Sequence, residues 1–141
     1  MSIAVKFGFC DPAGIVYTPK YFDIFNGVIE SWYDEVLKIS YTELNTRRQI
    51  GTGYAHASAD FGKPCRMGDI LEVAIVIGRV GRSSMTCTVH AFKDQMEYVR
   101  STFVTVTTLL PDQKVIALPD DLRSAFELYQ ERCGSIEALA S

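Results

Sequence analysis

The sequence of 141 residues lacks any apolar run of the roughly 20 residues that a membrane-spanning helix requires. Its longest apolar stretch, ILEVAIVIG, has the length of a strand and is interrupted by Glu72. The N-terminal stretch MSIAVKFGFC has no basic region followed by an apolar one, so we expect no secretion signal. These absences predict a cytoplasmic protein with no membrane partner.

An excess of basic residues is also absent. The chain carries 14 Lys and Arg against 17 Asp and Glu, which gives a net charge of -3. A general nucleic-acid binder would be basic, so we expect no nucleic-acid partner. The four cysteines are widely spaced, form no CxxC pair, and show no metal-ligand spacing with His56 or His90. We therefore expect free thiols and no metal site.

Internal repeats, low-complexity tracts and linkers are absent as well, so residues 1–141 are predicted to form a single domain. Alternating apolar residues from Ile3 to Phe9 predict a half-buried strand. Thr18 is expected to cap a long helix, with Pro19 in its first position. Steps of three and four between apolar residues continue this helix to Leu37.

Beyond this helix, Ser40 and Glu43 stand in capping-box register and predict a short helix that Gly51 ends. The segments 54–61, 70–80, 84–93 and 98–110 are rich in β-branched and aromatic residues, with turn signals between them. Such close spacing favours antiparallel hairpins. Residues 118–132 predict a terminal helix with acids in its first turn.

The long helix carries an apolar face that includes Phe22, Phe25, Ile29 and Trp32, and this face must be buried. The only large apolar surface available to it is the sheet. We therefore predict an α+β fold in which one antiparallel sheet curls around the helix. Such a sheet has exposed edges, and pairing with a second copy would remove one of them. We expect a dimer at least.

Asp11 begins the sequence Asp-Pro-Ala-Gly, directly after the first predicted strand. These residue types in this order favour a type I β-turn, so Asp11 is explained as a turn former. A catalytic role is the alternative. The unpaired backbone N–H groups at the start of the following helix could polarise a carbonyl group while the carboxylate attacks it or activates water.

The segment FCDPAGIVYTPKYFDIFNGVIESWY resembles the entry segment of the 4-hydroxybenzoyl-CoA thioesterase family, which has the hot-dog fold. ADFGKPCRMGDILEV and GRVGRSSMTCTVHAF resemble later segments of the same family, so the likeness covers nearly the whole chain. The resemblance implies a hot-dog fold and hydrolysis of an acyl-CoA thioester. Asp11 matches the catalytic carboxylate, as nucleophile or general base, and the N–H of Thr18 matches the group that polarises the thioester carbonyl.

Two departures from the family are visible. Phe9 stands where the family often has a second acid, and Tyr17–Thr18 replaces Trp-Tyr before the helix. Tyr17 is therefore a candidate substrate contact, and the acyl group stays open. By the same resemblance, Arg82, Ser83 and Ser84 surround the turn where the phosphates of coenzyme A would bind, although a solvated turn explains them as well.

His56 shares a predicted strand face with Ser58 and Asp60, but residues spaced along one strand are too far apart to act as a triad. We expect either a hydrogen-bonded strand residue or a histidine that lines the substrate pocket. His90 is expected to be structural. The absence of histidine between Asp11 and Trp32 argues against the dehydratase chemistry known on this fold.

The sequence thus favours a thioesterase for an aromatic or medium-length acyl-CoA, 4-hydroxybenzoyl-CoA-like, with no cofactor other than the coenzyme A of the substrate. A homodimer or homotetramer is expected. Two alternatives stay open: a non-catalytic hot-dog module that binds a thioester or a partner protein, and a thioesterase that acts on acyl-carrier protein.

Overall fold

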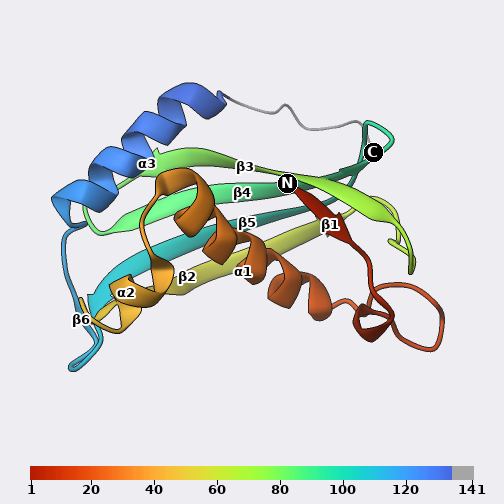
Figure 1. Ribbon diagram of the computed structural model, residues 1–141, viewed down its shortest axis with the longest axis horizontal. Coiled ribbons are helices and arrows are strands. Elements are labelled where there is room, and N and C mark those ends of the chain that lie inside the picture. Colours follow the sequence, from red (N-terminus) through yellow and green to blue (C-terminus); the bar gives the residue numbers. More distant parts are fainter. Residues whose placement is uncertain (135–141) are drawn as a thin grey trace.

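The computed structural model describes residues 1–134, in which an antiparallel sheet curls around a central helix (Figure 1). The strands are β1 (Ser2–Ala4), β2 (Ile50–Phe61), β3 (Ile70–Val80), β4 (Ser84–Lys93), β5 (Met96–Leu109) and β6 (Lys114–Val115). The helices are α1 (Lys20–Trp32), α2 (Tyr41–Asn45) and α3 (Asp120–Cys133). None of these described helices has both the length and the apolar character needed to cross a bilayer.

The sheet has the order β1-β3-β4-β5-β2, with β6 beside β5. The hairpins β3–β4 and β4–β5 join strands that are adjacent in sequence, as the close strand spacing predicts. β2 pairs with β5, although β3 and β4 lie between them in the sequence, and it forms one edge of the sheet. Within residues 1–134, the other side of β2 has no partner strand, so its twelve residues present an open edge.

The helix α1 lies across the concave face of the sheet and buries its aromatic side there (Figure 1). Phe25, Ile29 and Trp32 are buried as predicted, while Phe22 is half-buried with its ring 6.2 Å from that of Phe103 on β5. A π-helical turn, Tyr33–Leu37, continues α1 to the residue where the sequence predicts the end of the helix. The α+β hot-dog fold is confirmed.

The terminal helix α3 packs against the C-terminal end of α1 and covers part of β3. The ring of Phe126 stacks on Trp32 at 6.1 Å, and the hydroxyl of Tyr129 donates to the carbonyl of Ile75 at 2.6 Å. Because β1 and α3 together cover the β3 edge, β2 is the long edge that is left exposed.

Two local predictions are wrong. The expected strand from Ile3 to Phe9 ends at Ala4 and is followed by a 3-10 turn, Phe7–Phe9, in which Phe7 is 81% exposed. The short helix that Ser40 caps ends at Asn45, and Gly51 belongs to β2. In each case the local pattern is compatible with a longer element, but pairing with other segments decides where the element stops.

Candidate active site

A short hairpin places Asp11 at the end of the molecule where α1 begins. The N–H of Tyr17 donates to the carbonyl of Phe9 at 2.9 Å, which closes the hairpin. The N–H of Asp11 donates to the carbonyl of Ile15 at 3.0 Å, and the N–H of Gly14 donates to the carbonyl of Asp11 at 2.9 Å. The predicted Asp-Pro-Ala-Gly turn is therefore confirmed, and it holds Asp11 at the tip.

The carboxylate of Asp11 is half-buried and only partly used by this turn. Its Oδ1 accepts a hydrogen bond from the N–H of Ala13 at 2.8 Å. Its Oδ2 has no hydrogen-bond partner within residues 1–134. The side chain is thus oriented by one oxygen while the other oxygen is available, so a turn role and a chemical role are compatible at the same residue.

Thr18 follows the hairpin directly, and the geometry here differs from the prediction. The helix α1 begins at Lys20 with Pro19 as its cap residue, and no side chain caps it. The N–H groups of Lys20 and Tyr21 donate to the carbonyls of Tyr17 and Thr18, at 2.7 and 3.2 Å. Pro19 has no N–H. Of the amides in this turn, that of Thr18 finds no acceptor in the described part of the chain.

A cleft of about 280 Å³ lies beside this free amide. Its lining residues are Ile15, Val16, Thr18, Tyr21, Phe61, Gly62, Lys63 and Pro64. They come from the hairpin, the first turn of α1 and the loop after β2. The N–H of Val16 donates to the carbonyl of Cys65 at 2.9 Å and ties the hairpin to that loop.

The sequence reading missed Tyr21 and Phe61 as parts of this cleft. Their ring centroids lie 5.3 Å apart, and the Tyr21 hydroxyl accepts from the N–H of Cys65 at 3.3 Å. Burial raises the pKa of Tyr21 well above its usual value, so its hydroxyl stays protonated. The position of Tyr21 three residues after Thr18, on the inward face of the helix, was the available signal.

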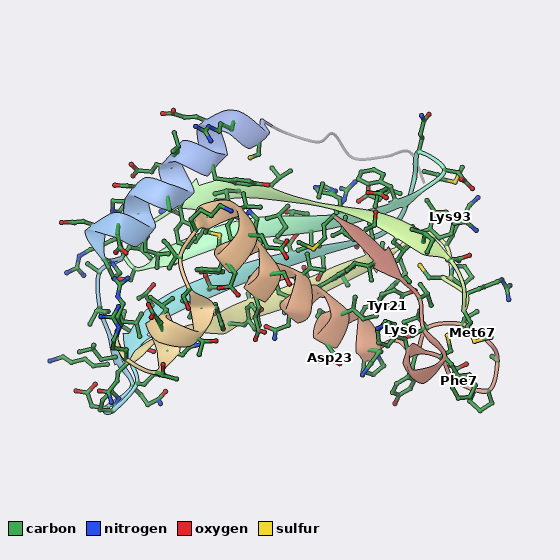
Figure 2. All side chains as sticks on the ribbon, viewed as in Figure 1. Lys6, Phe7, Tyr21, Asp23, Met67 and Lys93 are labelled. Carbon is green, nitrogen blue, oxygen red and sulfur yellow. The ribbon has the colours of Figure 1, made fainter. Side chains whose placement is uncertain are left out.

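The end of the molecule around Asp11 also exposes apolar side chains. Figure 2 shows Phe7 and Met67 projecting from the same end as Tyr21, although they come from different segments. Met67 is 58% exposed, and Tyr17, the candidate substrate contact, is 57% exposed. Tyr17 lies on the hairpin next to Thr18 but outside the lining of the cleft.

His56 lies on the open edge strand β2 and is exposed. His56, Ser58 and Asp60 are register partners of Val104, Thr102 and Arg100 on β5. Since Phe103 faces inward toward α1, these three β2 residues point to the opposite face of the sheet. They share a face as predicted, and His56 does not line the cleft beside Thr18 in the single chain.

Arg82, Ser83 and Ser84 lie at the other end of the sheet. β3 runs from Ile70, which pairs with β1 near the Asp11 hairpin, to the turn that contains Arg82. Its length separates the two ends by about 33 Å. The single chain therefore does not bring Arg82, Ser83 and Ser84 to Asp11.

Within residues 1–134, no group of His, Cys, Asp and Glu side chains is arranged to hold a metal ion. The four cysteines are free thiols, as predicted, and Cys65 and Cys87 are buried. Burial raises the pKa of both thiols, which disfavours the reactive thiolate form. At this end of the molecule, the Asp11 carboxylate and the Thr18 amide are the candidate reactive groups.

Comparisons with known proteins identify the family of this chain. A sequence profile of the thioesterase-like superfamily matches residues 5–126. A comparison with curated proteins gave no match. Among solved structures, a gentisyl-coenzyme A thioesterase is 25% identical, with 89% of this chain and 98% of that chain covered and a TM-score of 0.81.

Two further structures are similar over most of their length. A thioesterase superfamily protein from Jannaschia sp. CCS1 is 27% identical, with 91% of this chain and 90% of that chain covered and a TM-score of 0.83. A 1,4-dihydroxy-2-naphthoyl-CoA thioesterase from Synechocystis is 23% identical, with 89% and 93% covered and a TM-score of 0.81. At that identity, the last likeness concerns the fold alone.

Proposed function

Because this chain belongs to the thioesterase-like superfamily, we propose that it is an enzyme that hydrolyses an acyl-CoA thioester to a free acid and coenzyme A. One observation carries the proposal. The N–H of Thr18, which has no acceptor within residues 1–134, belongs to a residue that lines a cleft. Asp11, whose Oδ2 is free in the same part of the chain, lies on the hairpin that leads into this turn, outside the lining of the cleft.

In this mechanism the Thr18 N–H donates to the carbonyl oxygen of the thioester and stabilises the negative charge that develops there. The free Oδ2 of Asp11 then either attacks the carbonyl carbon or removes a proton from an attacking water molecule. The C–S bond breaks, the thiol of coenzyme A leaves with a proton, and the acid is released. Attack by Asp11 would release the thiolate and form a mixed anhydride, which one water molecule then hydrolyses, regenerating the Asp11 carboxylate and supplying the proton for the thiol.

The acyl group is proposed to be aromatic or of medium length, with 4-hydroxybenzoyl-CoA as one member of the class. Two features support an aromatic acyl group. The cleft beside Thr18 contains the aromatic rings of Tyr21 and Phe61, which suit a flat ring. The gentisyl-coenzyme A thioesterase to which the chain is similar is named for an aromatic acyl group.

The phosphates of coenzyme A are proposed to reach Arg82, Ser83 and Ser84 of a partner subunit. Ser84, Val106 and Gly53 are register partners in adjacent strands, so the Arg82 turn lies level with the start of β2. The other end of β2, Phe61, lines the cleft. A twofold axis that pairs β2 with its own copy would reverse one strand and bring the partner's turn toward this cleft.

Exposed apolar side chains on β2 support this homodimer. Tyr54 is 42% and Phe61 is 49% exposed, on a strand of twelve residues whose outer edge has no partner within the described chain. Long unpaired edges of this kind are covered or charged in most soluble proteins. Pairing with a second copy satisfies the free backbone groups and covers both rings. Assembly of two such dimers into a tetramer would leave this pairing unchanged.

The test is thiol release from a panel of substrates, measured with DTNB. The panel contains benzoyl-, 4-hydroxybenzoyl- and phenylacetyl-CoA, straight-chain acyl-CoAs from C4 to C16, and the same acyl groups on acyl-carrier protein. We expect turnover of at least one CoA thioester and a preference for aromatic or medium-length groups. Binding without thiol release would show that the protein is a binding module and not an enzyme. A preference for acyl-carrier protein would show that the substrate is a carrier-bound acyl group and not an acyl-CoA.

A further inference from the structure

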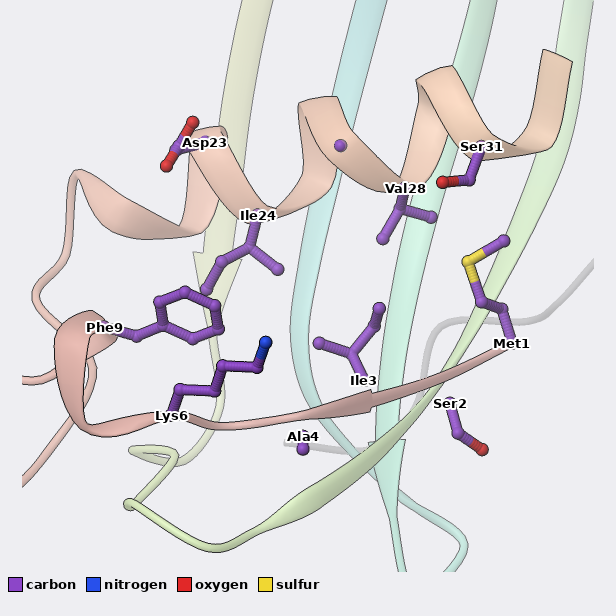
Figure 3. Close-up of a pocket in the computed structure, with 11 residues that line it drawn as sticks. Met1, Ser2, Ile3, Ala4, Lys6, Phe9, Asp23, Ile24, Val28 and Ser31 are labelled. Carbon is purple, nitrogen blue, oxygen red and sulfur yellow. The ribbon is translucent and has the colours of Figure 1, made fainter. Parts of the chain in front are cut away.

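A second and larger cavity, of about 490 Å³, lies between α1 and β1 (Figure 3). It shares no lining residue with the cleft beside Thr18. Its volume falls within the range of about 300 to 1,000 Å³ that is usual for small-molecule sites. Nothing in the proposed hydrolysis uses this cavity.

The walls of the cavity are partly apolar and partly polar. Ile3 projects from β1, and Ile24 and Val28 project from α1 toward the same space, which the ring of Phe9 closes at one end (Figure 3). Ile3, Ile24 and Phe9 are only partly buried, which is consistent with an unfilled space between the two elements. An apolar chain in this space would remove their exposed surface from water.

The mouth of the cavity carries a positive charge without a partner. Figure 3 shows the Lys6 side chain reaching past Phe9, with its ammonium group toward the space between Ile3 and Ile24. Within residues 1–134, Lys6 forms no ion pair. The one carboxylate of the lining, Asp23, is already paired with Lys20 at 2.8 Å.

Lys20 adds to this charge, because its ammonium lies 5.6 Å from the centroid of the Phe9 ring. Two ammonium groups, Lys6 and Lys20, therefore face a single carboxylate at the mouth, and the balance is positive. An anionic group that enters here is favoured, and it can form a charge-assisted hydrogen bond with Lys6.

Gly27 gives an independent indication that this space is kept open. It lies inside α1 and lines the cavity, although glycine in a helix costs about 0.5–1 kcal/mol relative to alanine. Its φ is not positive, and a Cβ atom built on it would meet nothing within 4 Å. Neither the backbone conformation nor a close neighbour requires glycine, and a large side chain at this position would enter the cavity.

We infer that the cavity between α1 and β1 is a second binding site, and that its ligand is a free carboxylic acid with a medium-length apolar chain. The carboxylate binds at Lys6, and the chain lies between Ile3, Ile24 and Val28. The site goes beyond the proposed hydrolysis, because binding here needs neither Asp11 nor a thioester.

Sodium decanoate, below its micelle concentration, is the probe. Calorimetric titration of the full chain should show saturable binding of one decanoate per chain. Amide resonances of Ala4 and Gly27 should shift in ¹H–¹⁵N spectra. Lys6→Gln should weaken the affinity about tenfold, as expected for loss of one charge-assisted hydrogen bond. Lys114→Gln, on exposed β6, is the matched control and should bind as the wild type does.

Gly27→Leu should abolish binding, because the leucine side chain occupies the space of the ligand. Gly27→Ala adds one methyl group and should retain binding, so the two variants separate filling of the cavity from a general effect on α1. If Gly27→Leu does not fold, the affinity of Lys6→Gln and the amide shifts still test the second binding site.

Three results would overturn the inference: no saturable binding, unchanged affinity in Lys6→Gln, or amide shifts confined to the cleft at Thr18 and Phe61. The proposed hydrolysis is tested independently of this second site. A protein that binds decanoate at Gly27 but releases no thiol loses only the proposed enzyme activity. A protein that hydrolyses acyl-CoA but does not bind decanoate loses only this second site.

Discussion

The N–H of Tyr17 donates to the carbonyl of Phe9 at 2.9 Å, and this hydrogen bond lies between the two candidate sites. Phe9 closes one end of the cavity between α1 and β1, and Thr18, which follows Tyr17, lines the cleft on the other side. The hairpin between them carries Asp11. Substitutions in this hairpin can test whether the proposed hydrolysis depends on the charge of Asp11, on its position, or on both.

Asp11→Asn is expected to lower acyl-CoA turnover by about two to four orders of magnitude, the usual effect of removing a positioned catalytic group. The Asn side chain keeps an oxygen that can accept from Ala13, so the turn and the melting temperature should be unchanged. Asp11→Ala loses this acceptor and should also lose about 1 kcal/mol of stability. An Asn variant with wild-type turnover would remove Asp11 from the mechanism.

Gly14 has φ +80, a left-handed conformation that residues with a side chain rarely adopt. Gly14→Ala is expected to lower the free energy of unfolding by about 1 kcal/mol, and to reduce turnover by displacing the Asp11 turn. Thermal denaturation and steady-state kinetics check both effects. Gly8→Ala is the matched control: Gly8 lies in the neighbouring 3-10 turn without a positive φ, and an added Cβ meets nothing within 4 Å.

Mixed dimers test whether one site draws on two subunits. A homodimer of the Asp11→Asn variant should lose turnover, and a homodimer of the Arg82→Ala variant should show a raised KM for acyl-CoA. A mixed dimer contains one subunit of each variant. In a mixed dimer, one site carries both substitutions and the other carries neither if Asp11 of one protomer works with Arg82 of the partner subunit. Co-purified mixed dimers should then show about half of the wild-type kcat/KM at the dimer level.

Differently tagged subunits allow such dimers to be isolated, and each homodimer serves as a control. If Asp11 and Arg82 act within one protomer, no mixed dimer contains an intact site, and the kcat/KM does not recover. A monomer in analytical ultracentrifugation would contradict the dimer itself.

A buried cluster on β4 and β5 predicts how stability depends on pH. Glu97 accepts hydrogen bonds from Arg100, at 2.8 and 2.7 Å, and contacts Nδ1 of His90 at 2.9 Å. Burial by itself raises the pKa of Glu97, but the hydrogen bonds from Arg100 and His90 outweigh it and lower the pKa below its usual 4.5. The folded protein thus keeps this carboxylate ionised to a lower pH than the unfolded chain does.

The stability that Glu97 contributes is therefore fully present above pH 4.5 and is lost as the pH falls through the lower pKa of the folded state. Glu97→Gln should cost about 3 kcal/mol at pH 7, because Arg100 is left without its carboxylate. In urea denaturation, the difference from the wild type should shrink below pH 4.5. Glu131→Gln, on the exposed side of α3, should show no such dependence, and a constant difference would contradict the assignment.

Local sequence signals were sufficient for much of the fold. The predicted strands 70–80 and 84–93 have the same bounds as β3 and β4, because turn residues and alternation specify a hairpin without reference to distant segments. The inward aromatic face of α1 could be predicted because its apolar residues recur at steps of three and four, which is also a local signal. The Ser40 cap is also confirmed, since the Glu43 N–H donates to its hydroxyl at 3.2 Å.

Most of the helices and strands, the direction in which α1 buries its rings, and the turn that carries Asp11 could therefore be predicted from local sequence. The end of β1 at Ala4, the place of Tyr21 and Phe61 in the cleft, and the position of Arg82 at the opposite end of the sheet from Asp11 required the folded structure. The physical reason is the range of the interactions. Periodicity and turn chemistry act between neighbours, whereas cavities, strand ends and free hydrogen-bond donors depend on segments far apart in the chain.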